Sequence, residues 1–413
     1  MTDPAHRLGA GRWIDAASIP PATVTTAHEL TTADGARTTG LLRVVPGAET
    51  VVCLMHPRQD VSHHVLVPEL LARGYAVWTQ GPRSVNNDLA LVHEQTLLDV
   101  GAGQVFLRDR GFAAVVTLGH SGGGTLFAFY HEQAGLPPDQ RLAMTPAGRP
   151  VGLPDAHLPL PDAAVFVAPH PGQGVLLSRL IDPSVVDESD PTSVDPALDP
   201  YSPDNGFAEP GISSHYEPGF IDRYRAAQLA RVARLDEVAR DRVGEAAAAR
   251  ARGDRRRALA PRLLTVYRTD ADLRYVDLSL DANERPYGSL FGRRPDLTNY
   301  GLLGFGRLST PDAWLSTWSV SASNANFLRC APAVTAPTLL VELSGDQACF
   351  PSDAARMAVG LGADDLTVTE VRGTHFGGAL GNGEPSGASL AAAEVGGWLE
   401  KRFPAGNAGG ESA

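Results

Sequence analysis

The residues Gly119-His120-Ser121-Gly122-Gly123 place one serine inside a G-x-S-x-G pattern. An apolar run over 113–118 leads directly into this pattern, and a helical run up to Gly135 follows it. A serine on such a strand–turn–helix bend exposes its Oγ beyond the end of the strand, where it can act as a nucleophile. Small neighbours suit the bend, because glycine permits close backbone approach. The pattern therefore predicts a reactive Ser121, against the alternative of a glycine-rich loop without chemistry.

Glycine-rich turns also bind phosphate groups, and this second reading of the stretch can be tested on its spacing. A P-loop carries Lys and then Ser or Thr after its glycines, and a dinucleotide site has G-x-G-x-x-G spacing near the start of a βαβ unit. The stretch Leu118–Thr125 has neither feature. We therefore do not expect a phosphate or dinucleotide site here.

A serine hydroxyl needs a base within hydrogen-bond reach, and the base needs a carboxylate that orients it. His375, in the stretch VRGTHFGG, follows a predicted strand over 366–371. Asp346, in VELSGDQACF, follows the preceding predicted strand over 338–343. The carboxyl ends of parallel strands lie at one edge of a sheet, so we expect Ser121, Asp346 and His375 to meet there.

The elements that must position these residues alternate along the chain. Short apolar or β-rich runs predict strands, and runs with apolar residues at helical spacing predict helices. Before residue 170 the predicted strands lie at 28–30, 38–45, 51–55, 75–79, 113–118 and 163–168, and the predicted helices at 64–73 and 89–110 and after Ser121. After residue 336, helices at 351–360 and 389–402 continue the alternation. This order predicts an α/β protein with a mostly parallel sheet and helices on both faces.

The alternation stops between residues 171 and 335. A Pro-, Asp- and Ser-rich loop is predicted over 183–205, a long helix over 221–252, and a β-hairpin from 263–267 and 273–280. We therefore divide the chain into a first core part, 1–170, an inserted cap, 171–335, a second core part, 336–403, and a disordered tail, 404–413. The aromatic residues of 284–328 are expected mainly to form the core of the cap, and otherwise to line a pocket.

With this nucleophile, this Ser–Asp–His order and this alternation, the sequence resembles the α/β-hydrolase superfamily over about 50–170 and 336–402. No narrower family is identified. The resemblance implies a mostly parallel, eight-stranded sheet, a catalytic triad and a cap inserted after the sixth strand.

The resemblance also suggests an oxyanion hole. In the superfamily one donor is the backbone N–H after the nucleophile, here Gly122, and the other comes from the loop after the third strand. That loop reads His56-Pro57-Arg58, and proline has no N–H, so the second donor is expected to be Arg58.

The composition of the 413-residue chain limits the kinds of molecule that it is expected to bind. The formal net charge of -12 argues against nucleic-acid binding. We find neither a signal peptide nor a membrane-spanning run, so a cytoplasmic location is expected. The three cysteines lack the spacing of a zinc site, and no cofactor or metal is expected. A homodimer remains open.

These residues favour a serine hydrolase that cleaves a carboxylic ester of a small or medium organic substrate through an acyl-enzyme on Ser121. The same three residues could instead cleave an amide, a thioester or a carbon–carbon bond, or transfer the acyl group to another acceptor. The alternative from a different functional class is a protein that binds a ligand and does not catalyse a reaction.

Overall fold

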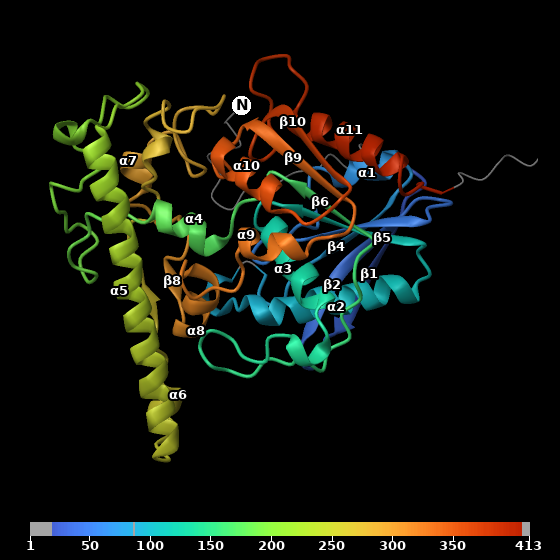
Figure 1. Cartoon of the computed structure of the whole chain (residues 1–413), viewed down its shortest axis with the longest axis horizontal. Helices are drawn as coiled ribbons and strands as arrows, with labels where there is room; N and C mark the ends of the chain where they lie inside the picture. The colour runs from blue at the N-terminus through green and yellow to red at the C-terminus, as the bar shows by residue number, and fades with distance from the viewer. Residues whose placement is uncertain (1–18, 86, 407–413) are drawn as a thin grey trace, which may run out of the picture.

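Eight strands form a single sheet at the centre of the molecule (Figure 1). The computed structural model describes residues 19–85 and 87–406. Across the sheet the order is β1-β2-β4-β3-β5-β6-β9-β10. The strands are β1 (Val24–Thr31), β2 (Arg37–Val44), β3 (Thr50–Met55), β4 (Ala76–Gln80), β5 (Ala114–His120), β6 (Ala163–Val167), β9 (Thr338–Gly345) and β10 (Leu366–Thr374). Among the strand pairs of the described residues in this sheet, only β1–β2 and β2–β4 are antiparallel, which confirms the prediction of a mostly parallel α/β sheet.

Alternating side chains of the strands fill two cores, one on each face. In β3, Val51, Cys53 and Met55 point into one core, and Val52 and Leu54 into the other. Because successive side chains on a strand point to opposite faces, a strand that is apolar at every position is covered on both sides. The first core lies under α2 (His93–Asp109), α3 (Gly122–Gly135), α9 (Phe327–Cys330) and α10 (Pro351–Gly360). The second lies under α1 (Val67–Ala72) and α11 (Gly387–Glu400).

Between β6 and β9 the chain leaves the sheet. This inserted segment contains α4 (Gln173–Leu180), α5 (Pro218–Ala251), α6 (Arg255–Leu259), α7 (Pro295–Thr298), α8 (Pro311–Ala313) and the small strands β7 (Leu264–Thr265) and β8 (Leu308–Ser309). It has its own buried clusters, one of which contains Trp314 and Trp318. At its base the Phe327 N–H donates to the Pro171 carbonyl oxygen (3.0 Å), so the outgoing and returning chain meet there.

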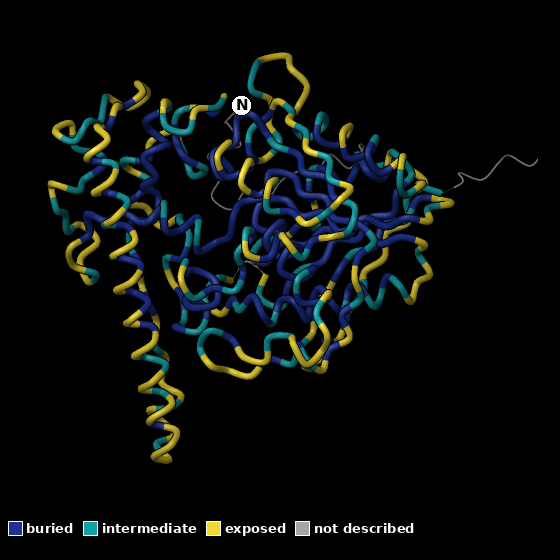
Figure 2. Tube along the Cα trace, viewed as in Figure 1, coloured by how far each residue is buried: buried dark blue, intermediate teal, exposed yellow. Residues whose placement is uncertain are grey.

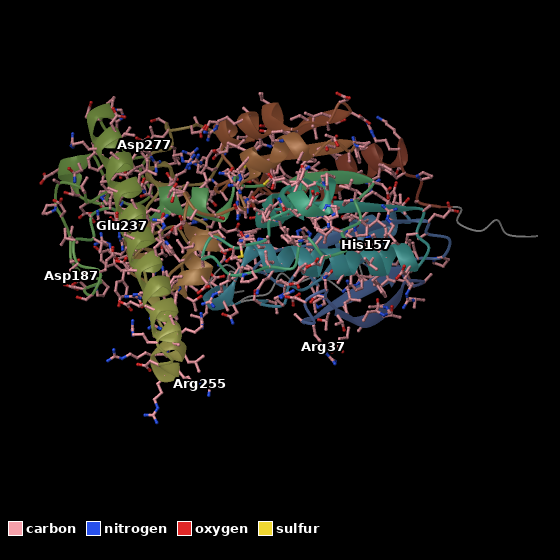
Figure 3. All side chains as sticks on the ribbon, turned by 60° about the horizontal axis from the view of Figure 1, so that its bottom comes forward. Arg37, His157, Asp187, Glu237, Arg255 and Asp277 are labelled. Atoms are coloured by element: carbon pink, nitrogen blue, oxygen red, sulfur yellow. The ribbon has the colours of Figure 1, made fainter. Side chains whose placement is uncertain are left out.

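The long helix α5 runs along one side of the molecule, and its C-terminal half extends beyond the rest of the body (Figure 1). Figure 2 shows that this outer half is largely exposed. In Figure 3, Glu237 lies part-way along α5, and Arg255, the first residue of α6, lies just beyond its far end. The helix spans 34 residues, close to the predicted 221–252.

The predicted hairpin over 263–267 and 273–280 is wrong. Leu264 and Thr265 pair instead with Ser309 and Leu308. Residues 273–275 form a short 3₁₀ helix that begins after Asp272, whose carboxylate accepts the Arg274 N–H (3.1 Å). Side-chain hydrogen bonds of this kind compete with a strand ladder for the backbone donors.

The two ends of the chain bear on two further predictions. The stretch searched for a signal peptide, 1–18, and residues 407–413 of the predicted tail lie outside the described residues. Within the tail, Pro404 and Ala405 accept hydrogen bonds from the Thr50 hydroxyl (2.8 Å) and the Glu49 N–H (2.8 Å). No helix in the described ranges is both long enough and apolar enough to cross a bilayer.

Candidate active site

Ser121 lies on a sharp bend between the end of β5 and the start of α3. Its backbone has φ 55° and ψ −124°, which non-glycine residues rarely adopt. The glycines on either side permit the bend. A Cβ at Gly119 would lie 2.6 Å from the Gly123 carbonyl oxygen, and a Cβ at Gly123 would lie 2.5 Å from that of Met55. The strained conformation of Ser121 is therefore held by close backbone contacts that only glycine allows.

The three residues predicted to meet at the end of the sheet do so. His375 Nε2 lies 2.9 Å from Ser121 Oγ, and His375 Nδ1 lies 2.9 Å from each carboxylate oxygen of Asp346. Since a carboxylate accepts, Nδ1 carries the proton and donates it to Asp346. The lone pair on Nε2 then faces the serine hydroxyl, as a general base requires.

Asp346 is fixed by the turn that follows β9. Its Oδ1 accepts the N–H groups of Ala348 (2.6 Å) and Cys349 (2.9 Å), and its own carbonyl oxygen accepts from Asn283 Nδ2 (2.8 Å). Asn283 belongs to the inserted segment. The carboxylate of Asp346 is thus held by the turn after β9, and its backbone is held by the inserted segment.

A row of histidines supports the loop that carries His375. His120 Nε2 lies 2.8 Å from the His375 carbonyl oxygen, which can only accept, so this nitrogen carries the proton. His120 Nδ1 is then an acceptor and takes the hydrogen bond from His64 Nε2 (3.2 Å). His120 thus holds the backbone of the predicted base, which the sequence did not indicate.

Of the two predicted oxyanion donors, Gly122 is well placed. It is the first residue of α3, and the N–H of a first helical residue has no acceptor within its own helix. The N–H of Arg58 has another partner, because it donates to His56 Nδ1 (3.0 Å), as does the N–H of Gln59 (3.0 Å). In this structure, therefore, the Arg58 N–H is used within its own loop and does not match the role predicted for it.

The Arg58 side chain joins this loop to the inserted segment. Its guanidinium forms two hydrogen bonds with the Asp88 carboxylate (2.5 and 2.6 Å). It also lies 4.9 Å from the ring centroids of both Phe305 and Trp318. Charge pairing and stacking on aromatic rings are both favourable for arginine, and together they fix this side chain beside the site.

Three further buried side chains form a group beside Gly122, next to Ser121, in which His170 and Gln173 approach Gly122 and His93 lies next to them. They are His93 at the start of α2, His170 just after β6, and Gln173 at the start of α4. Burial is the main cause that lowers the pKa of His93 and of His170 to about 3 each, and the charge of Arg58 acts in the same direction. Both imidazoles are therefore neutral over the pH range in which most enzymes work.

The site is largely buried. Ser121 is 9% exposed, and His375 and Asp346 are each 1% exposed. Within residues 19–85 and 87–406, no three His, Cys, Asp or Glu side chains are grouped so as to hold a metal ion.

The sequence matches no protein-family model and no curated protein sequence. Solved structures with a similar fold include the α/β hydrolase GrgF from Penicillium sp. sh18 (TM-score 0.47, 13% identity, 91% of this chain and 98% of that chain covered). Another is the esterase domain of a Rhodothermus marinus protein (TM-score 0.41, 10% identity, 92% and 99% covered). A third is DcsB in complex with a substrate analogue (TM-score 0.48, 11% identity, 92% and 99% covered).

The strand count and pairing of this chain are those of the α/β-hydrolase fold expected from the sequence. The identities and TM-scores are too low for the neighbours' activities to be carried over. The function must be argued from the site itself.

Proposed function

We propose that this protein is a serine hydrolase that cleaves carboxylic esters through an acyl-enzyme on Ser121. The observation that carries the proposal is the connected row Ser121–His375–Asp346, with 2.9 Å at each hydrogen bond, on a strained bend at the end of β5. The same set of residues on unrelated folds activates a serine for acyl transfer.

In the first half of the reaction Ser121 Oγ forms a bond to the ester carbonyl carbon while His375 Nε2 takes the hydroxyl proton. The π electrons of the carbonyl move onto its oxygen, and the Gly122 N–H stabilises the negative charge. When the tetrahedral intermediate collapses, the bond to the alkoxy oxygen breaks. His375 gives its proton to that oxygen, and an alcohol leaves.

In the second half water replaces the alcohol. His375 Nε2 takes a proton from water as the water oxygen bonds to the acyl carbon. The bond to Ser121 Oγ then breaks, and His375 returns the proton to the serine. Throughout both halves Asp346 accepts from Nδ1 and stabilises the imidazolium that forms.

An active-site fluorophosphonate tests this proposal directly. We expect it to label Ser121, located by mass spectrometry, and we expect Ser121→Ala to lose both the label and the turnover of p-nitrophenyl esters. Catalysis should fall by at least about a thousandfold, since the remaining groups give only a residual rate. Labelling at another residue, or ester turnover retained in the variant, would refute it.

Acyl transfer to an acceptor other than water is the second candidate, and the burial of the site favours it. Burial that leaves Ser121 only 9% exposed limits access of water to the acyl-enzyme. Product analysis with competing alcohols and amines separates the two. Transfer gives a new ester or amide in preference to the free acid, whereas hydrolysis gives the acid whatever acceptor is added.

A further inference from the structure

Three side-chain nitrogens converge on the Cα of Gly122. A Cβ at this position would lie 2.5 Å from Gln173 Nε2, 2.8 Å from His56 Nε2 and 3.0 Å from His170 Nε2. Glycine at 122 therefore makes room for nitrogens beside the N–H that is proposed to hold the oxyanion. None of the three comes from the element that carries Ser121.

The backbone fixes the position of Gln173. It stands between two glycines, and each is in close contact with the returning end of the inserted segment. A Cβ at Gly172 would lie 2.7 Å from the Ala325 carbonyl oxygen, and a Cβ at Gly174 would lie 2.6 Å from that of Ser319. Packing this tight on both sides fixes the backbone of Gln173 in advance of any ligand, and from that backbone its Nε2 reaches the position of a Gly122 Cβ.

The amide of Gln173 makes no well-formed hydrogen bond. Gln173 is 1% exposed, yet neither its Nε2 nor its Oε1 meets hydrogen-bond geometry within the described part of the chain, although the amide has a looser contact with the His93 ring. An unsatisfied buried polar group is costly, and native proteins keep few of them. A ligand atom that pairs with the amide would remove this cost.

His93 lies beside the Gln173 amide and likewise has one ring nitrogen without a well-formed hydrogen bond. Its Nδ1 lies 3.0 Å from Thr317 Oγ1, whose own hydroxyl donates to the Leu91 carbonyl oxygen (2.9 Å). The proton is therefore on Nδ1, and the fully buried Nε2 makes no well-formed hydrogen bond within the described part of the chain.

His170 is a donor toward Gly122. Its Nδ1 accepts the N–H of Gly172 (3.1 Å), so in the neutral ring the proton is on Nε2. The Thr125 hydroxyl donates to the His170 carbonyl oxygen (2.7 Å), which fixes the backbone of His170 against α3. The His170 Nε2–H is thus a second side-chain donor whose position beside Gly122 is set before any ligand binds.

We propose that Gln173 Nε2–H and His170 Nε2–H donate to the substrate carbonyl oxygen as it becomes an oxyanion, together with the backbone N–H of Gly122. This rests on the proposed acyl-enzyme reaction and adds two catalytic residues to it. The oxyanion hole is then built partly from neutral side chains, one of them supplied by the inserted segment in place of the Arg58 N–H.

The test compares Gln173→Met with the wild-type protein. Methionine keeps the length of the side chain and removes the N–H. We expect kcat on p-nitrophenyl esters to fall about a hundredfold, the usual effect of losing one oxyanion donor, with KM within about threefold of wild type. The second-order rate of fluorophosphonate labelling of Ser121 should fall in parallel, since its phosphoryl oxygen occupies the same site. Gln173→Glu, which places a carboxylate beside the oxyanion, should lose at least as much.

Gln228→Met is the matched control. Gln228 is also a buried glutamine of the inserted segment, and its Nε2 donates to the carbonyl oxygens of Arg179 and Ile181. Its loss should lower Tm and leave kcat per folded molecule unchanged. If Gln173→Met is folded by its Tm and labels at the wild-type rate, this inference is overturned while the proposed function stands. If the wild-type protein is not labelled at Ser121, both fall.

Discussion

Gly122 and Gly119 sit three residues apart, yet a methyl group at each would have different consequences. At Gly119 the added Cβ would meet backbone atoms of Gly123 and Gly124, each at 2.6 Å, which cannot move without breaking the bend. At Gly122 it would meet the ends of side chains, which can give way. We expect Gly119→Ala to cost about 1–3 kcal/mol of stability, the usual effect of overpacking. Gly122→Ala should instead fold with a Tm close to wild type and lose most activity.

Thermal unfolding and fluorophosphonate labelling together check this pair. Gly135→Ala, at the other end of α3, is the control, because a Cβ there has no atom within 4 Å and activity should not change. A stable, fully active Gly122→Ala protein would contradict the arrangement of donors around residue 122.

Asp270 is expected to weaken the folded state at neutral pH. It is fully buried; its Oδ2 accepts from Ser289 (2.8 Å) and Thr298 (2.5 Å), and its Oδ1 has no partner within the described part of the chain. Burial raises the pKa of this carboxyl to about 6. Between about pH 4 and pH 6 the Asp270 carboxyl is therefore protonated in the folded state and ionised in the unfolded state. The stability from this group is complete below about pH 4 and is lost as the pH rises through about 6.

Asp270→Asn should consequently stabilise the protein at pH 8, by up to about 3 kcal/mol for a pKa shift of about two units, and clearly less at pH 5. Denaturant unfolding at both values measures this difference. Asp272→Asn is the control of opposite sign. Its carboxylate pairs with Arg225 and Arg274, which keep its pKa far below the usual range, so the variant should be destabilised at both pH values.

At the residue scale the sequence could identify only groups whose position the sheet dictates. Ser121, Asp346 and His375 each follow a strand, and parallel strands bring their carboxyl ends to one edge, so their meeting was predictable. Gln173 and His93 reach the site through the packing of the inserted segment and of α2, which no local pattern encodes. The hydrogen bond from the Arg58 N–H to the His56 ring is a contact within the loop that the sequence did not indicate.

At the scale of elements, α5 is a single continuous helix whose two halves differ in how much they are packed against the rest of the molecule. Its buried side chains lie almost entirely between Phe220 and Ala239, and Ala249 is the single one beyond them. Amides that open by local unfolding exchange fastest where few apolar contacts hold them. Hydrogen–deuterium exchange should therefore be slow over 218–239 and faster over 242–259.

Gly244→Ala sharpens this prediction. A Cβ at this position has no atom within 4 Å, and alanine favours a helix over glycine by about 1 kcal/mol. Exchange should slow in the outer half, while global Tm and activity stay the same. Equal protection along the whole helix in the wild-type protein would contradict this division.

Long helices and strands with regularly spaced apolar residues were predictable from the sequence. The wrongly predicted hairpin over 263–267 and 273–280 shows where such spacing misleads. Val276, Leu278 and Leu280 alternate with polar residues as a strand would. Asp277, however, accepts the N–H groups of Ser279 (3.0 Å) and Tyr216 (3.1 Å) through its side chain. These bonds satisfy the backbone locally, so the alternation reflects a folded loop over a buried cluster and not a ladder.

At the scale of the whole molecule, the three thiols report on unfolding. Cys53, Cys330 and Cys349 are all buried and unpaired. Burial raises the pKa of Cys53 to about 12 and those of the other two above their usual range. A disulfide reagent such as DTNB should react with none of them in the native protein and with three after denaturation in guanidinium. Rapid reaction of a thiol in the folded protein would contradict the burial.

The hydrogen bond between Pro171 and Phe327 closes the base of the inserted segment, so another segment could replace it between the same two points. Because the outgoing and returning chain already touch, α9 and β9 can follow β6 with a different segment inserted between them. The length of that segment matters little, since doubling the length of a flexible loop costs only about 0.6 kcal/mol. Evolution, or a protein engineer, could therefore replace the segment and keep the sheet. Gln173 lies just inside this junction, so a graft that begins at residue 172 would bring its own group to Gly122, whereas one that begins beyond α4 would keep the present one.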